Sequence, residues 1–218
     1  MNKISVYVPN LQERVDRKKS IMHQFKRRSE FILTIVPAIK NKIGAWGLWQ
    51  TFIKIVEEEN KKGSDFFILC EDDHVFTKNY SSQYLFENIV AADDREADLL
   101  FGGVSWLQNA IQCTEHLFWL KAFNGLQFTV IYKRFYEKIL DSNLAEGYVA
   151  DFYLSTLSDS MFVMYPFISR QREFGYSDIT ETNNHEGYIN ELFRSTSKML
   201  DSLNKVKLFY KSISYEIR

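Results

Sequence analysis

The sequence predicts an α/β protein with a mostly parallel central sheet flanked by helices, and three observations carry this prediction. First, strand-like and helix-like segments alternate through residues 4–76, which is the order that right-handed crossovers and a parallel sheet require. Second, residues 66–70 form an unbroken apolar run, as expected of a strand buried on both faces. Third, that run ends in Glu71-Asp72-Asp73, at the strand end where ligands bind in open α/β sheets.

The elements of the N-terminal half follow from hydrophobic spacing. Residues 4–8 alternate in polarity and are β-branched, so they predict a first strand. Apolar residues at helical spacing predict a helix over 14–25, and the apolar segment 31–36 predicts a second strand. A second helix runs from 44 to about 59, where two lysines and a glycine then form a typical helix end.

The C-terminal half continues this pattern less regularly. The expected elements are a helix over 80–92, strands over 98–101 and 125–132, a helix over 133–140 and a last strand over 161–166. Residues 104–122 show little periodicity, so we expect an irregular segment there, either a mobile acceptor loop or an ordinary surface loop.

The length of 218 residues suits one domain with a small appendage. We assign residues 1–182 to the domain and residues 183–218 to a helical tail that packs on it through an apolar stripe. The tail also carries many Lys and Arg residues. An alternative is therefore that it lies as a basic amphipathic helix on an anionic lipid surface.

Composition narrows the function classes. The net charge is −1, so nothing indicates nucleic-acid binding. Only two cysteines occur, Cys70 in the predicted core strand and Cys113 in the irregular segment, which argues against a disulfide framework and fits a reducing compartment. The N-terminus has no secretory signal pattern, and no apolar run is long enough to span a membrane. We expect a soluble cytoplasmic protein, attached at most peripherally to a membrane.

The three acids after residue 70 are the main candidates for chemistry. Residues i and i+2 of an extended chain share a face about 6.6 Å apart, so Glu71 and Asp73 point one way and Asp72 the other. Adjacent anions at the edge of a core require a positive partner. A hard divalent cation, Mg²⁺ or Mn²⁺, would meet this need and leave positions open for a substrate's phosphates. The alternative is a solvated turn without a function.

Other charged residues are weaker candidates. Arg14 and Arg17, near the end of the first strand, are suited to binding a nucleotide's phosphates, although a solvated helix face is the simpler interpretation. Asp151 lies among apolar residues at a predicted helix start. There it either interacts with the helix dipole or, in a cleft, has a raised pKa and accepts a proton.

Four stretches together resemble glycosyltransferase family 25, the family of bacterial lipooligosaccharide sugar transferases and collagen galactosyltransferases. Residues 10–17, Asn-Leu-Gln-Glu-Arg-Val-Asp-Arg, are similar to the family's N-terminal signature. Residues 69–73 resemble its Glu-Asp-Asp motif, and residues 149–154 its Val-Asp-x-x-Leu segment. Tyr165-Pro166 followed by residues 176–181 resembles its closing Pro and Ser-Asp motif. The resemblance spans residues 4–181 and implies the GT-A fold, which is Rossmann-like.

The resemblance implies an enzyme that moves a sugar from a nucleotide-sugar donor to a hydroxyl of a glycan or glycolipid acceptor, with inversion and with Mn²⁺ or Mg²⁺. It also implies lipopolysaccharide-type assembly at the inner membrane face. Trp49 and Lys40 depart from the family pattern, which expects a histidine and an acid there. These departures bear on the identity of donor and acceptor.

The resemblance also implies a role for each candidate. Asp73 is expected to hold the metal, with Glu71 as a ligand or water-mediated partner and Asp72 near the ribose. Asn10, Arg14 and Arg17 are expected on the nucleotide side. Asp151 is the expected catalytic base, and Asp178 is a second candidate for a base or late metal ligand. His185 could complete the metal coordination, although a lone surface histidine is the simpler interpretation.

Three alternatives stay open. A nucleotidyltransferase also places acids after a parallel strand but normally has a glycine-rich loop after the first strand, and residues 9–13 contain no glycine. A phosphatase with an aspartyl nucleophile would carry an Asp-x-Asp-Gly-Thr-like stretch, which the sequence lacks. A non-catalytic binding or scaffold domain of the same fold is the alternative from a different class.

Overall fold

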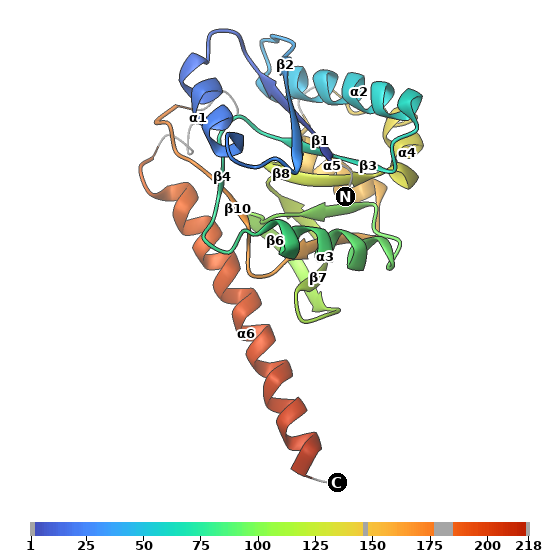
Figure 1. Cartoon of the computed structure of the whole chain (residues 1–218), viewed down its shortest axis with the longest axis vertical. Coiled ribbons are helices and arrows are strands. Elements are labelled where there is room, and N and C mark those ends of the chain that lie inside the picture. The colour runs from blue at the N-terminus through green and yellow to red at the C-terminus, as the bar shows by residue number, and fades with distance from the viewer. Residues whose placement is uncertain (1–2, 146–147, 177–184, 217–218) are drawn as a thin grey trace.

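An eight-stranded sheet with helices on both faces organises the chain (Figure 1). The computed structural model describes residues 3–145, 148–176 and 185–216. The strands of the main sheet, in spatial order, are β2 (Phe31–Pro37), β1 (Ile4–Asn10), β3 (Phe66–Cys70), β8 (Phe128–Tyr132), β5 (Leu99–Phe101), β9 (Met161–Met164), β7 (Leu117–Asn124) and β6 (Trp106–Gln112). A two-stranded sheet pairs β4 (His74–Phe76) with β10 (Ser169–Gln171). The helices are α1 (Val15–Phe25), α2 (Gly44–Lys62), α3 (Ser82–Asp93), the short 3₁₀ helix η1 (Lys133–Phe135), α4 (Tyr136–Leu140), α5 (Ala150–Leu157) and α6 (Tyr188–Glu216).

The main sheet is mixed, and the predicted α/β class is confirmed. Strand β1 pairs in parallel with β2 and β3, and β5 pairs in parallel with β9. Strands β8 and β7 run against their neighbours, so they oppose the direction that the other strands share. The parallel N-terminal half follows from the strand–helix alternation of the sequence, because each helix returns the chain to the same edge of the sheet.

Two hydrophobic layers enclose the sheet. Successive strand residues point to opposite faces, so Val6 and Val8 pack in one layer and Tyr7 packs in the other. Helices α1 and α3 cover the first layer, and α2, α4, α5 and the first part of α6 cover the second. Strand β3 is fully buried from Phe67 to Cys70, as its unbroken apolar sequence predicts.

Local signals explain where the helices begin and end. The hydroxyl oxygen of Ser81 accepts a hydrogen bond from the backbone N–H of Tyr84 at 3.1 Å and caps the start of α3. Helix α2 buries Phe52 and Val56 and ends at Gly63, whose φ of 71° lies in the left-handed region. These caps fix where α3 begins and where α2 ends.

The structure of residues 104–122 differs from the irregular segment that the sequence predicts. Instead of an irregular loop, the chain forms an antiparallel hairpin of β6 and β7, which pairs Leu107 with Phe123. The hairpin was missed because Gln108 and Asn109 are both exposed, and Asn109 has a positive φ of 49°. This interruption breaks the alternation by which a strand is recognised.

The two parts of the C-terminal helix α6 lie in different environments. Its first part packs on the domain through Ile189, Phe193 and Leu200, which are buried. Its last part extends away from the body of the protein and exposes Val206 and Phe209 among other apolar residues (Figure 1). Among the described residues, no helix is long and apolar enough to cross a membrane.

Candidate active site at the end of strand β3

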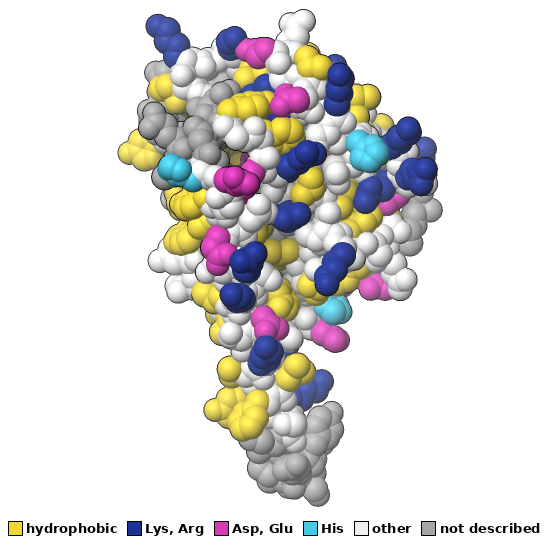
Figure 2. All heavy atoms as spheres, turned by 90° about the vertical axis from the view of Figure 1, so that its left-hand side faces the viewer, with side chains coloured by type: hydrophobic (Ala, Val, Ile, Leu, Met, Phe, Trp, Pro, Cys, Tyr) yellow, Lys and Arg dark blue, Asp and Glu magenta, His cyan; other side chains and the backbone are white. Residues whose placement is uncertain are grey.

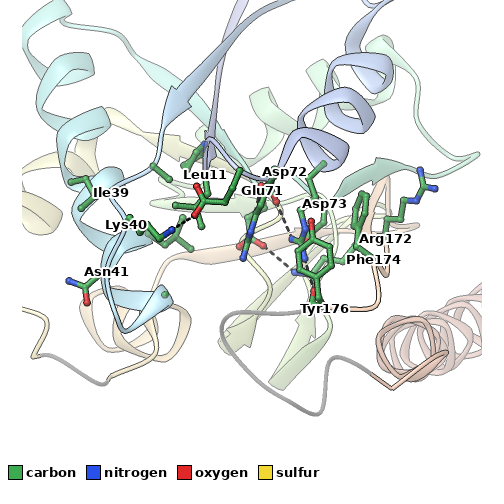
Figure 3. A pocket seen from close by; sticks show the side chains of 18 of the residues that line it. Leu11, Ile39, Lys40, Asn41, Glu71, Asp72, Asp73, Arg172, Phe174 and Tyr176 are labelled. Carbon is green, nitrogen blue, oxygen red and sulfur yellow. Dashed lines mark hydrogen bonds and ion pairs between the residues drawn. The ribbon is translucent and has the colours of Figure 1, made fainter.

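The acids Glu71, Asp72 and Asp73 follow β3 directly and line a cavity of about 680 Å³ (Figure 3). Strand β3 lies between β1 and β8, so the acids emerge from the interior of the sheet. Asp72 is only 5% exposed, and its two neighbours are partly buried. These acids therefore do not form a solvated turn, and each carboxylate has a defined environment.

Asp72 is held by residues from the end of β1, from the loop that follows it and from α1. Asn10 donates a hydrogen bond from Nδ2 to Asp72 Oδ2 at 2.8 Å, and Arg17 Nη1 donates to Asp72 Oδ1 at 3.1 Å. Arg14 Nη1 lies 3.9 Å from Asp72 Oδ2. The structure thus places the three residues that were predicted to bind the nucleotide around Asp72, the residue that was predicted to contact the ribose.

Asp73 shares the same arginine but keeps one oxygen unused. Arg17 Nη1 donates to Asp73 Oδ2 at 2.9 Å, while Asp73 Oδ1 is buried and has no hydrogen-bond partner among the described residues. Burial raises the pKa of the Asp73 carboxyl to about 6; the charge of Arg17 opposes this shift, and that of Asp72 adds to it. The unused oxygen can accept a further positive ligand.

The position of Arg17 depends on a segment that is distant in sequence. Its side chain is only 6% exposed, and Nη2 donates to the backbone oxygen of Tyr176 at 2.8 Å. The guanidinium carbon lies 5.0 Å from the centre of the Phe174 ring and 4.7 Å from that of Tyr176 (Figure 3). Cation–π contacts of this kind favour the charged group in a partly desolvated site. Sequence reasoning gave neither aromatic residue a role at this position.

Glu71 connects the acidic cluster to the second half of the site. Its Oε2 accepts a hydrogen bond from Gln171 Nε2 at 3.1 Å, a contact that the sequence did not indicate. Burial raises the pKa of Glu71 well above its ordinary value, and the charges of Asp73 and Asp151 raise it further. Asp151 therefore lies within electrostatic reach of the acids after β3.

Asp151, in the first turn of α5, is the predicted base. Its Oδ2 accepts a hydrogen bond from the backbone N–H of Gly125 at 2.6 Å, and burial raises its pKa to about 6. Gly125 has a φ of 120°, and a Cβ there would lie 2.7 Å from Gln127 Oε1, so the position requires glycine. The backbone oxygen of Gln127 in turn accepts from the N–H of Glu71 at 3.2 Å. Residues 125–127 thus join the two acids, a role that no sequence signal revealed.

The donor atoms at the cavity fit a hard divalent cation. Mg²⁺ is usually held by one or two carboxylates together with substrate phosphates, and Asp73 Oδ1 and the Glu71 carboxylate supply such oxygens. Within residues 3–145, 148–176 and 185–216, no three His, Cys, Asp or Glu side chains are grouped so that they could hold a metal by themselves. His185 is exposed at the start of the last helix, and Asp178 lies outside the described residues.

The two departures from the family pattern have different surroundings. Trp49 is a buried core residue that packs on Phe52 and Tyr153, with ring centres 5.5 and 5.6 Å apart. Lys40 lines the cavity (Figure 3) and forms an ion pair with Glu13, which also lines it. Only Lys40 is therefore placed to affect what the cavity binds.

The sequence matches no known protein family and no curated protein, so the resemblance to glycosyltransferase family 25 is not confirmed. The structure is similar to that of A197 from STIV, with a TM-score of 0.53 and 12% identity over 82% of this chain and 87% of that chain. This similarity shows a shared α/β fold.

Two further solved structures are more distant. UDP-glucose pyrophosphorylase complexed with UDP-glucose has a TM-score of 0.48 and 11% identity, over 91% of this chain and 100% of that chain. A glycosyltransferase involved in the glycosylation of the major capsid of PBCV-1 has a TM-score of 0.42 and 9% identity, over 75% of this chain and 94% of that chain. The function of the present protein must therefore be inferred from its own site.

Proposed function

We propose that the protein is a glycosyltransferase that moves a sugar from a nucleotide-sugar donor to a hydroxyl of a glycan or glycolipid acceptor. The observation that carries the proposal is the pairing of two acidic groups with different environments. Glu71 and Asp73 line the cavity beside Arg17. Asp151 forms no ion pair with any described residue, accepts a hydrogen bond from a backbone N–H and lies in electrostatic reach of Glu71. A cavity of about 680 Å³ is also of the size that small-molecule and cofactor sites have.

In this proposal the nucleotide-sugar donor binds in the cavity at the carboxyl ends of β1 and β3. Arg14 and Arg17 bring positive charge to the place where a diphosphate would bind, and Arg side chains suit phosphate recognition. Asp73 and Glu71 would hold Mn²⁺ or Mg²⁺. When bound, such an ion stabilises the negative charge that develops on a departing diphosphate. Asp72, fixed by Asn10, would bind the ribose.

In this proposal the acceptor hydroxyl binds near Asp151. A pKa of about 6 leaves this carboxylate mostly ionised near neutral pH, yet basic enough to accept a proton from an attacking hydroxyl. Attack from the side opposite the leaving diphosphate would invert the anomeric centre. The N–H of Gly125 fixes the orientation of the base, so the carboxylate is oriented before the acceptor arrives.

Binding and hydrolysis of nucleotide sugars test the proposal. We would measure calorimetric binding of UDP-glucose, UDP-galactose, UDP-N-acetylglucosamine and GDP-mannose with and without Mn²⁺, followed by donor hydrolysis. One donor is expected to bind in a Mn²⁺-dependent way, and D73N is expected to abolish the dependence. D159N, at an exposed acid paired with Lys121, is the matched control. Absence of donor binding would instead favour a scaffold domain.

A nucleotidyltransferase is the second candidate, because it would use the same acids on sugar phosphates and nucleoside triphosphates. The loop that would hold a triphosphate contains no glycine, and Pro9, Leu11 and Glu13 line the cavity there. This composition favours the glycosyltransferase. Release of pyrophosphate from UTP and glucose 1-phosphate in the same assay would favour the alternative.

We also propose that the end of α6 lies on an anionic membrane surface, where a glycolipid acceptor would be found. Four of its exposed apolar and aromatic side chains recur at spacings of four, three and four residues, which places them on one stripe of the helix: Met199, Leu203, Val206 and Tyr210. Lysines lie on both sides of this stripe: Lys198 and Lys205, Lys207 and Lys211. Figure 2 shows hydrophobic and basic side chains along this part of the helix. An apolar stripe with flanking basic residues suits a helix lying in a membrane interface.

A further inference from the structure

Three exposed aromatic side chains on or next to the elements that hold Asp151 have no part in the roles proposed above. Trp106, the first residue of β6, is 42% exposed, and Phe152, which follows Asp151 in α5, is 46% exposed. Tyr148, just before α5, is 66% exposed. The rings of Trp106 and Phe152 touch edge to face, with centres 5.6 Å apart and planes at 73°. Grouped exposed aromatic rings often mark a binding surface, since they leave apolar area in water.

The Trp106–Phe152 ring pair and Asp151 are held by the same elements, the β6–β7 hairpin and α5. Trp106 pairs across the hairpin with Asn124, and the next residue, Gly125, donates its N–H to the Asp151 carboxylate. Phe152 is the sequence neighbour of Asp151. The two rings and the carboxylate therefore keep a fixed relation to one another.

The residue before Trp106 is also firmly held. Ser105 donates its backbone N–H to the backbone oxygen of Asn124 at 2.8 Å and its hydroxyl to Asn124 Oδ1 at 2.8 Å. Thr196 of α6 donates its hydroxyl to the backbone oxygen of Ser105 at 2.8 Å. Trp106 thus begins its strand on a support made by β7 and α6, which suits a surface that must hold its shape before a ligand binds.

We infer that Trp106 and Phe152 form the subsite that binds a sugar ring of the acceptor. A pyranose ring carries apolar C–H groups on its faces and hydroxyls on its rim. Its faces can pack on aromatic rings while a rim hydroxyl reaches the adjacent Asp151. This inference rests on the proposed glycosyltransferase function and names the acceptor class: a carbohydrate bound through the face of its ring.

The surroundings of the rings favour a small ligand over a protein partner. The strand continues from Trp106 into Gln108 and Asn109, which are exposed and polar, so the apolar surface ends within two residues. A stable protein interface buries roughly 800 Å² on each partner, which is more than these few half-exposed side chains offer. A carbohydrate is small enough for them and also uses polar groups at the margin.

Saturation-transfer NMR with simple glycosides tests the inference on the full chain. The probes are methyl β-glucoside, methyl β-galactoside and methyl N-acetyl-β-glucosaminide. We expect at least one to bind the wild-type protein, W106A or F152A to weaken its binding roughly tenfold or more, and W106F to keep part of it. F209A removes an exposed aromatic ring from the far end of α6 and is expected to bind like wild type. Two variants at separate elements keep the test valid if one of them fails to fold.

Donor hydrolysis, in which water replaces the acceptor, separates this inference from the proposed function. Because neither ring lines the donor cavity, W106A is expected to hydrolyse a bound nucleotide sugar at the wild-type rate. Glycoside binding that is equal in wild type, W106A and F152A would overturn the inference, as would the absence of binding to wild type. Loss of both glycoside binding and donor hydrolysis in W106A would also overturn it, because the ring would then be structural. A wild-type protein that binds glycosides but no nucleotide sugar would contradict the proposed function alone.

Discussion

Arg17 Nη1 lies 2.9 Å from Asp73 Oδ2 and 3.1 Å from Asp72 Oδ1, so one guanidinium group bridges two adjacent carboxylates. The acids after β3 need positive charge to remain ionised where they are partly buried, and Arg17 supplies it from within the chain. The bridge leaves Asp73 Oδ1 without a hydrogen-bond partner in the part of the chain that the structure describes. The acidic cluster is therefore stable in the absence of a ligand and still able to accept a cation.

Replacing Arg17 by alanine should strongly destabilise the fold. The change leaves Asp72 and Asp73 without their shared partner, and removing one member of a buried ion pair typically costs about 3–5 kcal/mol. Urea unfolding at neutral pH would measure the loss. K121A, which breaks the exposed pair with Asp159, should change the free energy of unfolding by less than about 1 kcal/mol. Equal effects of the two substitutions would contradict the bridging role of Arg17.

The sequence predicted the elements of the fold better than their arrangement. Local patterns give β3 and the helices because apolar spacing and caps are short-range signals. The insertion of the antiparallel strand β8 between β3 and β5 is set by side-chain packing between segments far apart in the chain. The β6–β7 hairpin escaped prediction because Gln108 and Asn109 interrupt its alternation.

The same limit applies to the candidate site. The acids after β3 follow from the abrupt end of an apolar run, and Asn10, Arg14 and Arg17 lie one strand away from them. By contrast, the contacts of Tyr176 with Arg17 and of Gln171 with Glu71 join residues separated by 159 and 100 positions. No local pattern encodes such contacts, because they depend on how the chain returns through β10.

Gly125→Ala should reduce both stability and catalysis. A side chain at a φ of 120° is strained by about 1–3 kcal/mol. Its Cβ would also collide with the buried side chain of Gln127, which is held by a 2.6 Å hydrogen bond to the backbone oxygen of Gly103. The collision would displace the N–H that orients Asp151, so donor hydrolysis should fall at least tenfold.

Gly63→Ala is the matched control for this substitution. Gly63 also has a positive φ, 71°, but no heavy atom lies within 4 Å of a Cβ there. The control should lose about 1 kcal/mol of stability through backbone strain alone and keep its activity. If G125A were as active as G63A, Gly125 would have no role in positioning the base.

Asp151→Asn should remove transfer activity and yet stabilise the protein. The amide cannot accept the acceptor's proton, but its oxygen can still accept the hydrogen bond from Gly125. Because burial raises the pKa of Asp151 to about 6, the ionised carboxylate is less favourable in the folded state than in the unfolded chain. Its removal should then gain on the order of 1–3 kcal/mol at pH 7. Thermal unfolding and donor turnover measured together check this, and a destabilised variant would contradict the penalty that burial places on the Asp151 carboxylate.

The pH dependence of transfer should follow the ionisation of Asp151. A base with a pKa of about 6 is protonated below that pH, so the rate with saturating donor should rise about tenfold per unit at lower pH and level off above pH 6. The stability should change in the opposite direction. Between the unfolded pKa, near 3.8, and about 6, the folded state binds more protons, so the free energy of unfolding falls as the pH rises. D151N, which is expected to lack transfer activity, should weaken the pH dependence of the stability.

Leu203→Glu should weaken the binding of the full chain to anionic vesicles. Leu203 lies in the middle of the exposed stripe on α6, and a carboxylate there opposes burial in lipid and contact with negative headgroups. Co-sedimentation with vesicles of phosphatidylethanolamine and phosphatidylglycerol should fall severalfold. Binding of the wild-type protein should also fall with added salt or with neutral phosphatidylcholine vesicles, since the lysine contribution is screened or lost.

Leu208→Glu is the matched control, because it makes the same chemical change at an exposed leucine on the opposite side of α6. It alters the net charge equally but leaves the stripe intact, so binding should stay near the wild-type level. Equal losses in L203E and L208E would show that charge alone governs attachment. If L203E instead dissociated a dimer in sedimentation velocity without affecting lipid binding, the stripe would contact a second copy of the chain. The heptad-like spacing of Met199, Leu203, Val206 and Tyr210 makes that the physical alternative to a membrane.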